Sequence, residues 1–177
     1  MSPLIKNITR FILLILVQSF VLDKVHVNKM VTPYIYFIFI LWLPFNMNRS
    51  WLMVIAFITG FTLDAFRHSY GFHAAACVMM AYFRPFLINL LIPHEGAETN
   101  YDEPSMKSIG GFVPYLIYVS VLTLIHHGWL FLLEAWELAN VWYFLANTFL
   151  STALSLLLII ITELLFSRRQ KFRTNTA

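Results

Sequence analysis

The sequence predicts an all-α protein of the polytopic membrane class, a bundle of six transmembrane helices. Three observations lead to this prediction. Of the 177 residues, 59% are hydrophobic and only 12% are charged, and the mean hydropathy is +0.71, far from the composition of a soluble domain. Several apolar runs approach the roughly 20 residues that a helix needs to cross a bilayer. Charged residues gather between these runs and are rare within them.

The predicted spans form a single membrane domain with a basic tail. They cover residues 4–22, 33–45, 51–66, 70–92, 112–133 and 141–166, and the tail covers 167–177. The first run resembles a signal peptide, but no small-residue cleavage site follows it, and Asp23 and Lys24 come at once. We therefore expect an uncleaved first helix, with Gln18 buried in the bundle.

The second and fourth spans are the least regular. Pro33 suits the first turn of a helix, but the run 33–45 is short for a full crossing. Arg84 and Pro85 interrupt the fourth span, and the piece 86–92 is expected to lie at the interface as an amphipathic turn. The hydrophilic segment 93–111 predicts a loop, because nothing in it could build a core.

The last two spans carry polar residues within apolar runs. Span 112–133 contains His126 and His127, and Glu134 follows it. Span 141–166 contains Asn147 and Glu163 and is long enough to cross at a tilt.

The distribution of basic residues predicts the orientation. Six spans place both termini on one side of the membrane, and basic residues favour the cytoplasmic side. With cytoplasmic termini, the turn between the third and fourth spans faces the exterior. The count strongly favours this arrangement, with Lys6, Arg10, Arg49, Arg84, Lys107, Arg168, Arg169, Lys171 and Arg173 inside and Lys24, Lys29 and Arg67 outside.

The third and fourth spans predict a tight antiparallel hairpin. Ala56, Gly60 and Asp64 follow one another on one face of the third span, and Ala74, Cys77 and Ala81 form a second small-residue stripe on the fourth. Small residues let membrane helices approach closely. We expect Asp64 and Arg67 to pair at the hairpin tip, and Gly71 to restart the chain after the turn.

Two interpretations of this hairpin remain open at the level of sequence. The stripes are typical of plain helix packing, and they are also compatible with a binding surface. Asp64 is either a structural cap that pairs with Arg67 at i+3 or a residue that contacts another chain, since charged groups at membrane depth are costly and usually functional.

The remaining polar residues do not form a catalytic constellation. His126 and His127 are adjacent, so on a helix they point about 100 degrees apart and cannot chelate one ion together. His127 shares a face with Glu134 two turns away, and we expect polar contacts within the bundle. The alternatives are a proton path or a ligand contact, and a metal site. His68 and His73 are expected to be solvated or interfacial.

No cofactor, metal or nucleic acid is predicted, and the sequence indicates a protein that is not an enzyme. Cys77 is the single cysteine, so no thiolate metal site can form. A phosphate-binding loop is also lacking. The basic tail from Arg168 to Arg173 anchors the topology and attracts anionic membrane lipids.

The segment GFTLDAFRHSYGFHAAA resembles the signature of the MreD family of rod-shape-determining membrane proteins, with Gly60, Asp64 and Gly71 at the matching positions. The resemblance implies the bacterial inner membrane and a non-enzymatic scaffold of the cell-elongation complex. Implied partners are the single-span protein MreC, the RodA glycosyltransferase, its class B penicillin-binding partner and MreB filaments. It also implies a fold like the six-helix substrate-binding components of energy-coupling-factor vitamin transporters.

That fold analogy leaves a second function open, a substrate-capture subunit of a small-molecule transporter. Aromatic residues between Tyr34 and Trp42 could then line a pocket. The short exterior loops argue against this function, because they offer little material to close over a ligand. A small membrane enzyme that uses the histidines is the third possibility.

Overall fold

Five long helices build the protein in the computed structural model, which describes residues 3–24, 31–92, 103–135 and 141–165. They are α1 (Pro3–Phe20), α3 (Arg49–Arg67), α4 (Phe72–Leu91), α5 (Phe112–Glu134) and α6 (Val141–Leu165). A 3-10 turn, η1 (Leu22–Lys24), follows α1, and a single turn, α2 (Ile38–Leu41), precedes α3. The described residues contain no β-strand. The long helices begin and end within about two residues of the predicted bounds.

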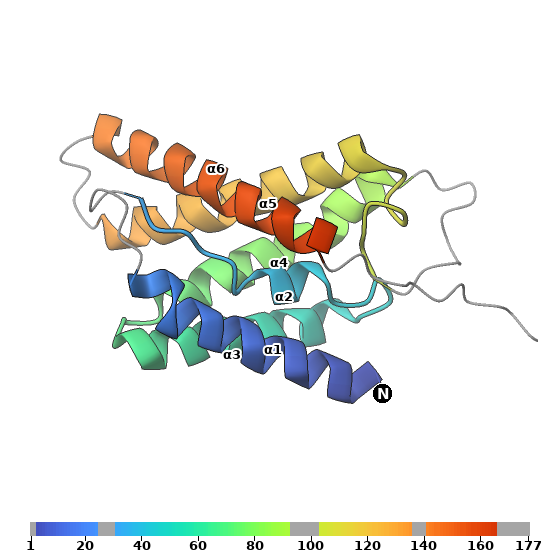
Figure 1. Ribbon diagram of the computed structural model, residues 1–177, viewed down its shortest axis with the longest axis horizontal. Helices are drawn as coiled ribbons and strands as arrows, with labels where there is room; N and C mark the ends of the chain where they lie inside the picture. The colour runs from blue at the N-terminus through green and yellow to red at the C-terminus, as the bar shows by residue number, and fades with distance from the viewer. Residues whose placement is uncertain (1–2, 25–30, 93–102, 136–140, 166–177) are drawn as a thin grey trace, which may run out of the picture.

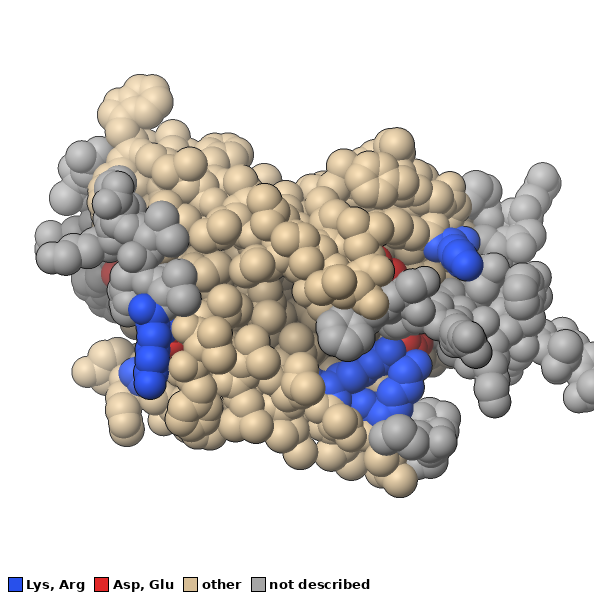
Figure 2. Space-filling model, viewed as in Figure 1, with Lys and Arg blue, Asp and Glu red and all other residues tan. Residues whose placement is uncertain are grey.

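All five long helices could cross a membrane. They contain 18 to 25 residues, and their most apolar windows have mean hydropathies from 1.3 to 2.2. Lys, Arg, Asp and Glu gather towards the two ends of the face in Figure 2, with a broad band of other residues between them. The chain is therefore a multi-pass membrane protein. Tail residues 167–177 lie outside the described residues.

The predicted second span, 33–45, is not a transmembrane helix. Residues 31–37 form no helix, and α2 adds only four residues. Even so, the chain from 31 to 43 runs lengthwise through the bundle (Figure 1). We call it the crossing segment. Because it still carries the chain from one end to the other, α1 begins and α6 ends at the same end of the bundle.

Local sequence explains why the crossing segment does not form a long helix. Its aromatic and β-branched residues have low helix propensity. Pro33 has no backbone N–H to donate, and Pro44 disfavours helical geometry at the residue before it. Irregular backbone at membrane depth is tolerated only where protein surrounds it. Every residue from Tyr34 to Leu43 is buried.

Side chains of four long helices supply hydrogen-bond partners to the crossing segment. Near its start, Ser151 and Ser155 of α6 accept from the N–H groups of Thr32 (3.2 Å) and Tyr34 (3.0 Å). Gln18 of α1 accepts from the Ile35 N–H at 2.9 Å and donates to the Pro33 carbonyl at 3.1 Å. These bonds replace part of the ladder that a helix would have provided.

The other end of the crossing segment is held by α4 and α5. Tyr118 donates to the Leu41 carbonyl at 3.0 Å, and Arg84 donates to the Leu43 carbonyl and, at 3.0 Å, to the Tyr118 hydroxyl. Arg84 is 1% exposed. Its position corrects the expectation that Arg84 and Pro85 interrupt the fourth span, because α4 continues through Pro85 to Leu91. The expected interfacial turn at 86–92 is therefore the last part of α4.

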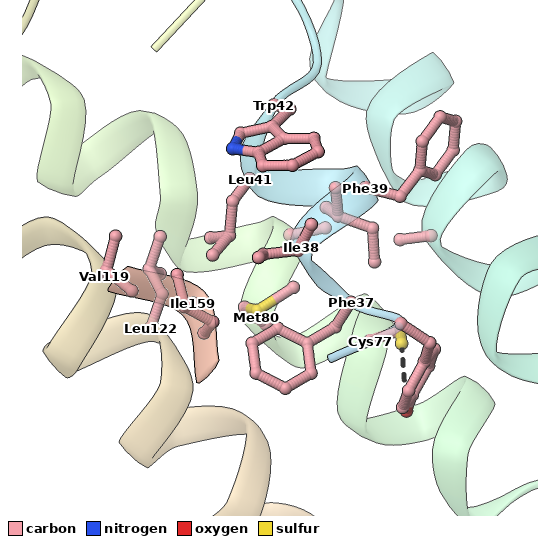
Figure 3. Close-up of a cluster of buried hydrophobic side chains, with 14 of the residues drawn as sticks. Phe37, Ile38, Phe39, Leu41, Trp42, Cys77, Met80, Val119, Leu122 and Ile159 are labelled. Carbon is pink, nitrogen blue, oxygen red and sulfur yellow. Dashed lines mark hydrogen bonds between the residues drawn. The ribbon is translucent and has the colours of Figure 1, made fainter. Parts of the chain in front are cut away.

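Apolar side chains of the crossing segment fill the centre of the bundle. Figure 3 shows Phe37, Ile38 and Leu41 among residues of three long helices, namely Met80 of α4, Leu122 of α5 and Ile159 of α6. A short segment with a single helical turn can thus replace the predicted sixth helix, because its side chains pack into the interior between the long helices.

Losing the glutamine that supports this chain should be costly. In Gln18→Leu, the Ile35 N–H and the Pro33 carbonyl lose their partners inside the bundle, and each such loss costs roughly 1–3 kcal/mol. We expect a lower unfolding temperature in mild detergent. Thr9→Val is the control on the same helix, since the Thr9 hydroxyl bonds only to its own helix at the Ile5 carbonyl. Equal stability of the two variants would contradict the prediction.

The end of the predicted loop 93–111 packs against the bundle. Of this segment the structure describes 103–111, which form turns and bends with no helix or strand, and in which Ile109 is buried. Glu103 accepts from Lys6 at 3.0 Å and from Arg10 at 2.9 Å, which ties the segment to the beginning of α1.

The contact between Glu103 and α1 should weaken in acid. Burial opposes ionisation of Glu103, but hydrogen bonds and positive charge from Arg10 and Lys6 outweigh it and lower the pKa of this carboxyl. A lowered folded-state pKa adds stability above the unfolded pKa, and this stability is lost as pH falls through the folded pKa. We expect thermal unfolding to separate wild type from Glu103→Gln by about 1 kcal/mol or less at neutral pH. The two should converge below about pH 4, and a gap independent of pH would refute the prediction.

Candidate functional site

The hairpin of α3 and α4 is packed backbone to backbone at Gly60. A Cβ atom at this position would lie 2.4 Å from the His73 carbonyl oxygen and 2.5 Å from both Cα and N of Ala74. No side chain fits there, so only glycine permits this approach. The small-residue stripes thus allow the close packing that their sequence pattern predicted. They bring the beginning of α4 next to the last turns of α3.

This approach lets Asp64 cap α4. The first turn of a helix has N–H groups without intrahelical partners, and Gly71 at the N-cap position has no side chain to satisfy them. The carboxylate of Asp64 accepts instead from the N–H groups of His73 at 3.2 Å and Ala74 at 2.9 Å. Negative charge at a helix N-terminus is favourable. Gly71 also has φ 89°, a left-handed conformation that suits glycine.

Asp64 also binds two side chains. Its Oδ1 lies 2.5 Å from the Ser69 hydroxyl and 2.8 Å from Nδ1 of His73. Asp64 is 2% exposed and His73 is 1% exposed. The expectation that His73 is solvated or interfacial is therefore wrong. The close packing at Gly60 encloses this histidine and provides a carboxylate partner for it.

Arg67 does not pair with Asp64, contrary to the sequence-based expectation. Its Nη1 donates to the Tyr34 hydroxyl at 2.8 Å and lies 2.9 Å from Nε2 of His73, and its Nε lies 3.6 Å from Asp23. A guanidinium can only donate, so Nε2 of His73 accepts and Nδ1–H donates to Asp64. This arrangement assigns a neutral imidazole with a defined tautomer.

These side chains form one network, which we call the Asp64 cluster: Asp23, Tyr34, Asp64, Arg67, Ser69 and His73. The cluster joins α3 and α4 to the crossing segment through Tyr34. Asp23 further accepts from Gln18 of α1 at 2.8 Å. Both ring nitrogens of His73 and the Asp64 carboxylate are engaged within the cluster. The cluster therefore ties α3, α4 and the crossing segment together at one end of the bundle.

His127 belongs to a second hydrogen-bond chain. Its Nδ1 donates to the Thr123 carbonyl at 2.9 Å, and its Nε2 lies 3.2 Å from the Ser155 hydroxyl. Ser155 in turn accepts from the N–H of Tyr34. Both ring nitrogens are thus occupied, and Glu134, an exposed residue at the end of α5, is not the partner of His127.

His126 points to a different part of the core. Its Nε2 lies 2.7 Å from the Tyr36 hydroxyl, which also accepts from the Cys77 thiol at 3.5 Å, and its ring stacks on Phe37 with centroids 4.4 Å apart. Both histidines therefore make polar contacts within the bundle, as we expected from the sequence. Among the described residues, no three His, Cys, Asp or Glu side chains are grouped as metal ligands would be.

Several residues of the site were missed by sequence reasoning, above all His73, Tyr34 and Arg84. One signal could have found two of them. His73 lies four residues before Cys77 and Arg84 seven residues after it. Helical periodicity therefore places both on the packed face of α4. No comparable signal exists for Tyr34, because its partners come from distant segments.

Comparison of the chain with protein families, with curated proteins and with solved structures finds no match to any of them. The function is therefore inferred from the geometry and the chemistry of the described residues.

Proposed function

We propose that this protein is a non-enzymatic scaffold in the bacterial inner membrane that binds an MreC-like single-span partner. In this proposal it supports a RodA-type glycosyltransferase and a class B penicillin-binding protein along MreB filaments, and so maintains rod shape. Both termini are cytoplasmic and the hairpin tip faces the exterior. The residues that carry the MreD resemblance, Gly60, Asp64 and Gly71, support the proposal because together they define the geometry of one hairpin.

The proposal rests mainly on an apolar groove on the outer face of this hairpin. A groove of about 660 Å³ follows α3 and α4. Ala75 and Val78 line it, together with the partly exposed rings of Phe57, Phe61 and Tyr82. Small residues let another helix approach closely in a membrane. Among the described residues, no charged side chain lines the groove, so it suits an apolar helix such as the span of an MreC-like partner.

A scaffold role also agrees with how the buried polar residues are used. Asp64, His73 and His127 bind one another or the backbone of their neighbours. Groups that fix the shape of a bundle make its surface a defined template for other membrane proteins, whereas an enzyme needs reactive groups that a substrate can reach.

Copurification of an MreC-like partner tests this proposal. Val78→Trp places a large ring in the groove and should reduce the amount of partner recovered with the purified protein at least several-fold. Leu157→Trp is the control, because Leu157 lies exposed on α6, away from the groove. Gly60→Leu and Asp64→Ala should also weaken association while the protein still inserts, since they distort the hairpin. Failure of the wild type to recover the partner would refute the scaffold role.

Depletion of the protein in a rod-shaped host provides a second test. The proposal expects rods to become spheres. Unchanged shape together with a new nutrient requirement would favour a transporter instead.

One observation favours a second candidate, the substrate-capture subunit of a vitamin-type transporter. Transporters commonly place substrates beside discontinuous segments at the membrane midplane, and the crossing segment is discontinuous. Against this candidate, Tyr34, Tyr36 and Phe37 are themselves packed into the centre of the bundle. Mass spectrometry of the purified protein for a retained vitamin-sized ligand tests this function.

A further inference from the structure

The groove on α3 and α4 ends beside an arginine. Arg49 begins α3 and lies four residues before Met53, which lines the groove, so the two residues share a face of the helix. The Arg49 guanidinium lies over the ring of Tyr82, 4.0 Å from the ring centroid, and Tyr82 is the last residue of α4 in the groove lining. Arg49 therefore places a positive charge at one end of an apolar surface.

This charge is available to another molecule. Arg49 is exposed, and the only hydrogen bond of its side chain to the described residues is a long one, from Nη2 to the Tyr82 carbonyl at 3.4 Å. Lys6, Arg10 and Arg67 each contact a carboxylate, whereas no carboxylate of the described residues contacts Arg49. Because a guanidinium has five N–H donors, most of those on Arg49 remain for a partner.

The groove is long enough to hold a helix. On α4 its lining extends from Gly71 to Tyr82, which is about 17 Å at 1.5 Å per residue. The hydrocarbon core is about 30 Å thick, so a membrane-spanning helix in this groove extends past its end and passes Arg49. Arg49 stands at one end of a helix that could cross the membrane, and a charged partner residue is less costly there than at the bilayer centre.

We propose that the groove on α3 and α4 binds a transmembrane helix whose acidic side chain pairs with Arg49. The apolar lining holds the helix, and the ion pair fixes its position along the groove and selects it from other apolar helices. A carboxylate suits this role because it can accept two N–H donors of one guanidinium. This inference rests on the proposed function, since it names the chemistry of the partner that uses the same groove.

Binding of synthetic single-span peptides to the purified full-length protein tests the proposal. Three labelled peptides share one apolar helix and differ only in the residue just beyond one end, which is glutamate, glutamine or lysine. Fluorescence energy transfer in phosphatidylcholine nanodiscs measures their affinities. Wild type should bind the glutamate peptide about five-fold more tightly than the glutamine peptide, and the lysine peptide most weakly.

Variants at Arg49 separate the effect of charge from that of packing. Arg49→Ala should remove the preference for the glutamate peptide, Arg49→Lys should retain it, and Arg49→Glu should reverse it in favour of the lysine peptide. Val78→Trp should weaken binding of all three peptides, because it fills the groove. Lys6→Ala is the matched control, since it removes a positive charge at the same end of the bundle but outside the groove lining. Circular dichroism establishes that each variant is folded.

Three results would overturn the proposal. Wild type could bind none of the peptides or all three equally, or Arg49→Ala and Lys6→Ala could have equal effects. Loss of the glutamate preference when phosphatidylglycerol replaces phosphatidylcholine would assign Arg49 to a lipid phosphate. Failure of the proposed function is a separate result: a preference for the glutamate peptide without recovery of an MreC-like partner would refute the scaffold role alone.

Discussion

Replacing Gly60 by leucine should destabilise the protein more than any other single substitution in the hairpin. Even a Cβ at this position would come within 2.4 Å of the His73 backbone. Backbone atoms cannot rotate away, so α3 and α4 must separate. Overpacking costs about 1–3 kcal/mol even where side chains can adjust, and we expect Gly60→Leu to cost about 3 kcal/mol or more. Thermal unfolding in mild detergent measures this loss.

Gly128→Ala is a matched control for the substitution at Gly60. Gly128 also lies inside a helix, α5, but nothing lies within 4 Å of a Cβ added there. Alanine has a higher helix propensity than glycine by about 1 kcal/mol, so Gly128→Ala should leave stability unchanged or raise it. If Gly60→Leu and Gly128→Ala behaved alike, the close backbone contact between α3 and α4 would be refuted.

Replacing Asp64 by alanine should have the second largest effect. The buried N–H groups of His73 and Ala74 would lose their acceptor, and His73 would lose its carboxylate. An unpaired buried polar group costs roughly 1–3 kcal/mol, so we expect a total loss of about 3 kcal/mol or more. Asp64→Asn keeps one acceptor oxygen and should be less harmful than Asp64→Ala.

Glu134→Ala is the control for the loss of a carboxylate. Glu134 ends α5 and is exposed, and surface substitutions usually change stability by less than about 0.5 kcal/mol. Hydrogen exchange followed by mass spectrometry adds a local measurement. Asp64→Ala should increase exchange in the first turn of α4 before the rest of the protein, and uniform exchange along α4 would contradict a capping role for Asp64.

Most of the helical frame could be predicted from the sequence, because membrane helices depend on local properties. Apolar length determines whether a helix can span the bilayer, and small residues at helical spacing determine where two helices can approach. Gly60 illustrates this well, since its place in a stripe predicted the close packing. For Asp64, one of the two open interpretations predicted a cap, and the structure gives it that role for α4, without the predicted Arg67 pair.

The errors share a physical cause. Residues 33–45 have the apolar composition of a helix, but their backbone finds partners in Gln18, Ser151 and Ser155 of distant helices, and such alternatives cannot be read from local periodicity. His73 had the sequence neighbourhood of an exposed turn and became buried because Gly60 lets α4 approach α3. Arg67 could have paired with Asp64 on its own helix. Instead, Asp64 binds His73, and Arg67 binds Tyr34.

By itself, the sequence determined that this chain crosses a membrane several times, where most helices begin and end, and which two helices pack most closely. These properties follow from hydrophobic length and from side-chain size, which act locally. Only the tertiary structure decided that a segment with a single helical turn crosses the interior, and which partner each buried polar group has. The reason is that a buried hydrogen bond depends on which groups meet in space. Asp64 and His73 meet only when α3 and α4 pack together, and Gln18 and Ile35 only when α1 packs against the crossing segment.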